Sequence, residues 1–436
     1  MGKWIPVNRF TSFLILLFVI GSNARAQEED LSLALALEKA LDNNYGIIIS
    51  RSETEISTVN NAWGTAGRYP SIDFSGGSYN NYDINNTANF STNRLSAGLG
   101  LRWTIFDGFR VKVTKDKLSQ LEVLAKGRLA VIVESTIMDV VMAYYLVLLQ
   151  QEELVVLEDV MKLSEDRYNY EQSRYEIGST ASYNVLQAKN VYLNDKTLFM
   201  NQEMVLRNSV RNFNFLIGEE PTMTWNFIEE FKPGDAKYKL GDLLDKMMAS
   251  NQTLQNQYAN LVLQQNEIKL KKSDLYPSLD LSAGITDSWA YINRDNSDPT
   301  RGNALNSYGN LLLSYPIYTG GTRKRAIEVA RINEEIADVE IDQMQHSLTN
   351  QLMNTYDFHE VRVALLGVAE ESLEAAELNM QIAGEKFRSG AINSFNYRDI
   401  QVIYLTSALR RLEAIYDVID SRTNLTRLIG GFITEN

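Results

Sequence analysis

The segment RLSAGLGLRWTI (residues 94–105) is the part of the chain that says most about its fold. Its apolar side chains stand at every second position from Leu95 to Ile105, and the positions between them hold polar or small residues. A period of two over this length predicts a strand with one apolar face and one polar face. A second stretch repeats the pattern, with Leu279, Leu281 and Ala283 alternating against polar or small residues.

These strands belong to a duplicated chain. YPSIDFS (69–75) recurs as YPSLDLS (276–282), an offset of 207 residues, and IFDG (105–108) matches IYTG (317–320) at an offset of 212. The second offset continues to the end of each half, where LIG (216–218) matches LIG (428–430). We therefore expect two tandem repeats, 27–218 and 240–436, joined by a linker over 219–239.

Each repeat is expected to hold a helix, a β-hairpin and two long helices ending near 218 and 430. The hairpins are predicted at about 70–106 and 277–318. The last strand, near Ser307–Tyr318, is less regular, because Leu312 falls on the polar face and Pro316 lacks a backbone donor. No proline stands between 71 and 220 or between 317 and 436, which permits long helices over about 108–176 and 321–388.

The helices alone are compatible with a soluble coiled-coil bundle, but the strands argue against it. One hairpin per repeat provides no second sheet to cover its apolar face, so we expect that face to contact lipid in an outer-membrane barrel. Four strands cannot close a barrel, since single-chain examples begin at about eight. The barrel must be shared, and strand counting alone leaves two or three chains open.

The N-terminus predicts export. Lys3 and Arg9 precede an apolar run, and Ala24-Arg25-Ala26 fits a signal-peptidase site, so residues 1–26 are interpreted as a signal peptide. Removing them takes the formal net charge from -13 to -16, because three cations and no acidic residue are lost. Such an acidic chain is a poor candidate for nucleic-acid binding, and without cysteine it has neither disulfides nor a lipid-modified cysteine.

The repeated motifs resemble the TolC family of outer membrane efflux proteins. The matching features are the two strand entries, the junctions WTIFDG (103–108) and YPIYTGG (315–321), and the turns RYEIG (174–178) and KFRSG (386–390). The resemblance implies a mixed α+β membrane fold, in which three chains share a 12-stranded barrel continued by a periplasmic α-helical barrel. It implies a homotrimer in outer-membrane lipid that works with a periplasmic adaptor and an inner-membrane transporter of the RND or ABC type. The linker would lie in an equatorial collar.

The resemblance also places a constriction at the periplasmic tip. Related proteins carry inward aspartates six and nine residues after the second tip glycine, where this chain has Asn396 and Asp399. The first-repeat counterparts are Asn184 and Gln187, so one acidic ring is expected beside an uncharged one. The plain alternative for Asp399 is a solvated carboxylate on a helix face. The remaining candidates are the tip glycines with the aromatic residues three positions before them, and the strand-to-helix junctions: Gly178, Gly390, Tyr175, Phe387, Gly108, Gly320 and Gly321. The tip glycines would cap helices, and the aromatic pair would either latch neighbouring helix pairs together or serve as ordinary packing.

Nothing in the sequence indicates an enzyme or a cofactor. His346 and His359 are the only histidines and have no further ligand set, which argues against catalytic zinc. The predicted function is a passive exit duct for small molecules or proteins in an efflux or secretion system, including type I secretion. The competing hypothesis is a trimeric adhesin or structural spacer that does not transport.

Overall fold

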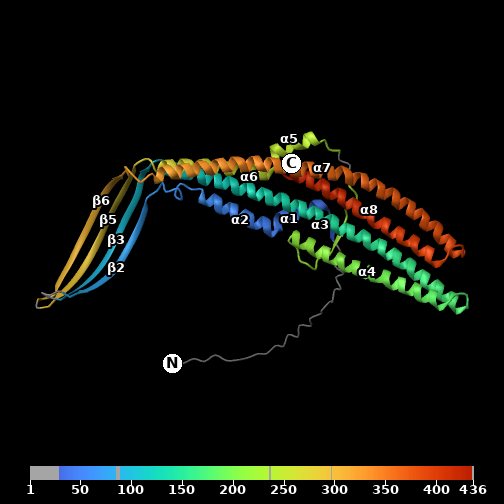
Figure 1. Ribbon diagram of the computed structural model, residues 1–436. Coiled ribbons are helices and arrows are strands. Elements are labelled where there is room, and N and C mark those ends of the chain that lie inside the picture. Colours follow the sequence, from blue (N-terminus) through green and yellow to red (C-terminus); the bar gives the residue numbers. More distant parts are fainter. Residues whose placement is uncertain (1–28, 85–88, 235–236, 296, 435–436) are drawn as a thin grey trace, which may run out of the picture.

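The computed structural model describes residues 29–84, 89–234, 237–295 and 297–434. The molecule is elongated, with a sheet at one end and a bundle of long helices running away from it (Figure 1). The predicted signal peptide, residues 1–26, lies outside the described residues.

The sheet contains both predicted hairpins. β2 (Ser71–Asp83), β3 (Phe90–Asp107), β5 (Ser278–Arg294) and β6 (Thr300–Ser314) lie side by side in the order β2-β3-β5-β6, all antiparallel. Leu101 of β3 pairs with Ile72 of β2 on one side and with Ala283 of β5 on the other, so the apolar residues share one face. The sheet is open within the chain, and β2 and β6 form its edges.

Two details of the predicted strands are wrong. The alternation through Ile105 ends early, because a β-bulge between Thr104 and Phe106 inserts one residue and brings Phe106, instead of Ile105, opposite Leu279. β6 ends at Ser314, so Pro316 lies beyond the strand, where its missing N–H is no cost to the ladder. The irregularity at Leu312 is real, since it pairs with Asp280 on the polar face.

The long helices confirm the repeat. α3 (Arg110–Glu176) and α7 (Thr322–Arg388) both have 67 residues, and each is about 100 Å long at 1.5 Å per residue. After a tight turn, α4 (Ser182–Leu216) and α8 (Ser394–Leu428), with 35 residues each, run back alongside them. A short α9 (Gly431–Thr434) follows α8.

The helix predicted before each hairpin is divided in two by an asparagine. α1 (Leu33–Asn43) and α2 (Tyr45–Asn60) meet at Asn44, and α5 (Leu240–Ser250) and α6 (Gln252–Ser273) meet at Asn251. The Asn44 Nδ2 donates to Leu216 O at 2.8 Å, and the Asn251 Nδ2 donates to Leu428 O at 2.9 Å. The side-chain Oδ1 of each accepts from the next helix, so one residue ends one helix, begins another and ties both to the end of its repeat.

The core lies midway along the helices. β1 (Glu29–Leu31) pairs in parallel with β4 (Trp225–Phe227) of the linker, and both pack with α1, α3 and α4. Tyr144 is fully buried there and donates from its hydroxyl to Leu31 O at 2.7 Å. A second cluster joins α5 and α6 to α7 and α8.

One described helix, α3, contains a stretch that is long and apolar enough to cross a membrane by length and composition alone. Glu134 and Asp139 interrupt that stretch, and Val140, Tyr144 and Val147 within it are fully buried in the helical core. Part of this stretch therefore packs in the helical core.

Candidate functional site

The two tip turns have the same backbone. Gly178 (φ 73°) and Gly390 (φ 76°) adopt the left-handed conformation just after α3 and α7. Ser179 N donates to Arg174 O and Ala391 N donates to Lys386 O, both at 2.7 Å, the six-to-one bond of a Schellman cap. The predicted glycine caps are therefore present at both turns.

The aromatic residues three positions before these glycines have different surroundings. Phe387 is 9% exposed; it stacks on Tyr397 of α8 with centroids 4.7 Å apart and meets Tyr170 of α3 at 5.4 Å. Tyr175 is 51% exposed. The helix pairs α3–α4 and α7–α8 form a first and a second helical hairpin. Among the described residues, Phe387 links the second helical hairpin to the first, through its contact with Tyr170 of α3.

The four predicted constriction residues all lie close to the tip turns. Asn396 and Asp399 are exposed in the first two turns of α8, and no described residue contributes a hydrogen bond or ion pair to the Asp399 carboxylate. Asn184 and Gln187 are half-buried at the start of α4, and the Asn184 Nδ2 donates to Thr180 Oγ1 at 2.9 Å. Asp399 is thus the exposed acidic group among the four.

An ion pair between a buried aspartate and a half-buried arginine lies next to Asp399 and joins the two repeats, and sequence reasoning missed it. Both terminal nitrogens of Arg398, on α8, donate to the Asp195 carboxylate of α4 at 2.8 Å. Asp195 is 2% exposed. Two parallel charge-assisted bonds in a desolvated site are a strong geometric constraint. The available signal in the sequence was the seven-residue spacing of Asp195 from the apolar Ala188, which puts both residues on one face of the helix.

Arg167 of α3 completes this polar seam. It is 2% exposed, and its Nε donates to Ser394 Oγ, at the start of α8, at 2.7 Å. Burial, followed by the nearby positive charge of Arg398, lowers the pKa of Arg167. Its Nη1 and the Oε2 of Glu171 are buried without a hydrogen-bond partner among the described residues. The seam is therefore strongly polar and incompletely satisfied.

The junction glycines connect the sheet to the helices. Gly108 (φ 68°), Gly320 (φ 61°) and Gly321 (φ 76°) all adopt positive φ, and Phe109 does so too at 70°. A Cβ on Gly108 would collide with the backbone oxygen of Ser273, so the junction requires glycine there. Phe109 was not anticipated from the sequence.

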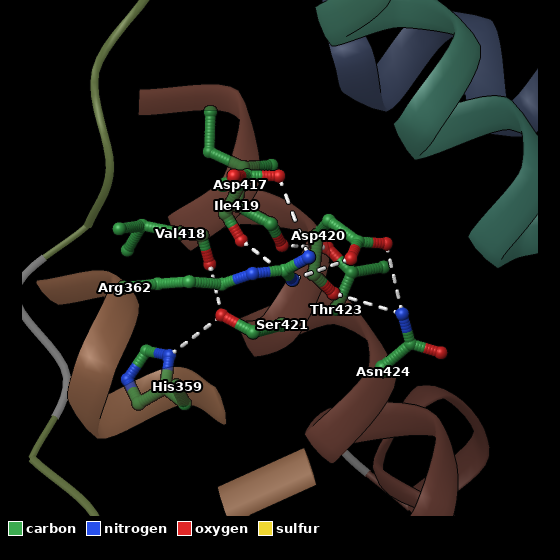
Figure 2. Close-up of polar contacts among 9 residues, drawn as sticks. All are labelled: His359, Arg362, Asp417, Val418, Ile419, Asp420, Ser421, Thr423 and Asn424. Atoms are coloured by element: carbon green, nitrogen blue, oxygen red, sulfur yellow. Dashed lines mark hydrogen bonds and ion pairs between the residues drawn. The ribbon is translucent and has the colours of Figure 1, made fainter. Parts of the chain in front are cut away.

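A second polar cluster joins α7 to α8 farther from the tip (Figure 2). Arg362 Nη1 donates to Asp420 Oδ2 at 2.6 Å and to Asp417 O at 3.0 Å, and Asn424 Nδ2 donates to Asp420 Oδ1 at 2.9 Å. The His359 Nδ1 lies 3.0 Å from Ser421 Oγ. In the described residues no group of three His, Cys, Asp or Glu side chains has the arrangement of a metal site, and these contacts lock the second hairpin together.

His359 also contacts the linker. Its ring meets Tyr238 edge to face with centroids 5.4 Å apart. Burial lowers the pKa of His359, which favours the neutral ring that packs there. The linker is thereby held against the second hairpin.

The fold matches solved outer-membrane channels. CusC, whose structures describe transmembrane channel formation, matches with a TM-score of 0.73 and 14% identity, covering 93% of each chain. The CmeC outer membrane channel of Campylobacter jejuni matches with a TM-score of 0.72 and 15% identity over 99% of this chain and 94% of that one. The open state of the MtrE outer membrane channel of Neisseria gonorrhoeae has a TM-score of 0.68 at 15% identity, covering 92% and 89%.

A family model matches both repeats. The model described as "Outer membrane efflux protein" covers residues 36–219 and 243–431. No curated protein matches the chain. The family consists of channels, not enzymes, that lie in the outer membrane and extend into the periplasm. The duplicated hairpins, the paired long helices and this match establish that the chain belongs to the outer membrane efflux protein family.

Proposed function

We propose that this protein is the passive exit duct of a multicomponent efflux or secretion system. Three chains would share one 12-stranded barrel and one helical tunnel, fed by a periplasmic adaptor and an inner-membrane pump. The observation that carries the proposal is the open four-stranded sheet, because its edge strands β2 and β6 leave backbone groups that lipid cannot satisfy. Pairing β6 of one chain with β2 of the next removes these edges.

The helices support the same assembly through an asymmetry between the repeats. α3 packs along α8 within the chain, whereas α4 and α7 have no comparable contact in the described structure. The outward apolar side chains follow this difference. α8 exposes Phe395, Val402 and Ile403. α4, of equal length, exposes Tyr183, Leu186, Leu193, Leu198, Met200, Met204, Val205 and Phe215.

The offset of 212 residues predicts the register of the missing contact. Tyr416 of α8 donates from its hydroxyl to Met142 O of α3 at 3.4 Å. The residue equivalent to Tyr416 in the first repeat is Met204 of α4, and the residue equivalent to Met142 in the second repeat is Asn354 of α7. Both are exposed. In a closed ring, Met204 of one chain would lie beside Asn354 of the next.

Cysteine cross-linking tests this register without interference, since the chain has no cysteine of its own. Met204→Cys/Asn354→Cys should give a covalent trimer on treatment with a short bifunctional thiol cross-linker, because a contact made through a long tyrosine side chain does not bring the two backbones within disulfide range. The matched control, Met142→Cys/Tyr416→Cys, should give an internal bridge and stay monomeric in denaturing gels. Cross-linked products no larger than a dimer, or no cross-link at all in the outer membrane, would contradict the proposed ring.

For conduction, we propose that Asp399 forms the acidic ring at the tip and Asn396 an uncharged one, with Asn184 and Gln187 flanking them. The support is the exposed, unpaired Asp399 carboxylate at the end of α8 nearest the tip. Asp399→Ala should lower the cation preference of reconstituted trimers in single-channel recordings under a salt gradient. An unchanged reversal potential would refute this role. Absence of any conductance would favour the adhesin or spacer.

The linker, residues 219–239, would form the equatorial collar. Its β4 pairs with β1 midway along the helices, and Tyr238 contacts α7 near the same level. The adaptor and the pump class, RND or ABC, would act beyond the tip. Co-purification of the intact outer-membrane protein with cross-linked periplasmic partners tests this part.

A further inference from the structure

The end of the sheet nearest the helices carries a band of exposed aromatic side chains. Tyr318 is 87% exposed and lies just after β6, in the junction to α7. The same end of the sheet also presents Tyr69, Trp103, Phe109, Tyr276 and Tyr315, which are between 39% and 63% exposed. Aromatic side chains collect at the two surfaces of a membrane, so this band marks the surface facing the periplasm.

In the sequence, positively charged residues come directly after the strands that carry this band, although the whole chain has a net charge of -13. Residues 108–117 hold four cations and one acid, and residues 319–328 hold three cations and one acid. Two of these cations are neutralised, because Arg110 pairs with Asp274 and Lys117 with Glu267. Three other cations of these two segments, and two that precede them in the chain, are exposed and form no ion pair with a described acidic side chain: Lys112, Lys324 and Arg325, with Arg68 and Lys272.

A chain of contacts links part of this positive charge to the apolar face of the sheet. Trp103 belongs to the apolar face, where it pairs with Leu281, and its Nε1 donates to Arg68 O at 3.0 Å. The Arg68 guanidinium lies 4.7 Å from the Trp63 ring centroid, and the Lys115 ammonium lies 5.9 Å from the same ring. Trp63 thus brings two cations together next to a segment that is hydrogen-bonded to a tryptophan of the apolar face.

We propose that this junction is a binding site for anionic phospholipid headgroups in the periplasm-facing leaflet of the outer membrane. Lipid phosphates lie at the level of the aromatic band, where exposed guanidinium and ammonium groups can donate to them. Juxtamembrane clusters of Lys and Arg attract anionic lipids through the same charge complementarity. In the assembled protein, the site would repeat around the neck between barrel and tunnel and fix its depth in the membrane.

The test uses the full mature protein purified in mild detergent and exposed to equal amounts of phosphatidylglycerol and phosphatidylcholine. Bound lipids are counted by native mass spectrometry. The wild-type protein should retain phosphatidylglycerol preferentially. The variant Arg68→Gln/Lys112→Gln/Lys272→Gln/Lys324→Gln should lose most of this preference, with an expected drop of at least about fivefold at low salt.

The matched control removes the same charge far from the membrane, on α4, with Lys189→Gln/Lys196→Gln/Arg207→Gln/Arg211→Gln. It should keep the wild-type preference. An unchanged preference in the junction variant, or an equal loss in the control, would overturn the proposal. A variant that keeps its lipids but changes the ion selectivity of reconstituted channels would also overturn it, because the cations would then face the lumen. None of these readouts requires the proposed pump or adaptor, so the site and the exit-duct function can fail separately.

Discussion

The two tip turns have one backbone and two environments. Gly178 and Gly390 adopt the same conformation with the same capping hydrogen bonds. Yet Phe387 is packed between Tyr397 and Tyr170, while Tyr175 is mostly exposed. A duplicated sequence pattern therefore reproduces local geometry, whereas burial depends on which helix lies alongside.

The neighbour that makes the difference is α3. It flanks the second hairpin inside the chain and brings Arg167 and Tyr170 to that tip, but no described helix flanks the first hairpin in the equivalent way. The first tip would acquire its neighbour from the next chain in the proposed ring. Substitutions at each tip and along α3 can measure how much this neighbour contributes.

The largest effect is expected from the ion pair of Asp195 and Arg398. Asp195→Ala leaves the half-buried Arg398 without its partner and close to the like charge of Arg167, which should destabilise the folded protein by about 3–5 kcal/mol. The midpoint of thermal unfolding in detergent measures it. Asp166→Ala, an exposed acid on α3, is the control. Equal shifts in both variants would mean that the seam adds nothing specific.

Removing the aromatic contact should cost somewhat less. Phe387→Ala creates a cavity under Tyr397 and should destabilise the protein by about 3 kcal/mol. Tyr175→Ala, in chains dissociated in detergent, should change stability by less than about 0.5 kcal/mol. If the Tyr175 variant loses stability only when assembled, the next chain covers that side chain. Equal losses of stability for the Phe387 and Tyr175 variants in dissociated chains would contradict the difference in burial between the two tips.

The stability of the packing between α3 and α8, away from the tip, should also depend on pH. Burial raises the pKa of Glu134 on α3 from 4.5 to about 7, with Arg427 of α8 opposing the shift. The folded state thus holds this proton more tightly than the unfolded chain does. Stability is therefore full below the unfolded pKa, near 4.5, and is lost as the pH rises from there through about 7.

Glu134→Gln should remove this pH dependence and raise stability at alkaline pH by about 1–3 kcal/mol. Unfolding midpoints across the pH range measure it. Glu152→Gln, at an exposed position of the same helix, should leave the profile unchanged. A Glu134→Gln profile that parallels the wild type would exclude Glu134 as its source.

The smallest effect concerns the shared backbone. A Cβ would meet no atom within 4 Å at Gly178 or Gly390, so alanine there adds only left-handed backbone strain. Gly178→Ala and Gly390→Ala should each cost about 1 kcal/mol in unfolding experiments. Clearly unequal losses of stability would show that the two caps differ energetically despite their equal backbone geometry.

The repeat, the strands and the long helices could be predicted from the sequence because they depend on local patterns. Alternation at Leu95–Trp103 requires a two-faced strand, and the absence of proline permits 67-residue helices. The tip caps were equally local, because glycine alone tolerates positive φ without strain. The bulge at Ile105 was not local, since it is defined only by the partner strand β5.

Side-chain environments depend on tertiary contacts, and at the candidate site these contacts decided most of what matters. The order of residues alone shows that Asp399 stands nine positions after a helix-capping glycine. The folded chain was needed to pair Arg398 with Asp195, two residues 203 positions apart in the chain, and to show that Phe387 is buried while Tyr175 is exposed. The physical reason is that helical periodicity specifies which face of a helix is apolar, but the partner of that face is selected by packing between distant segments.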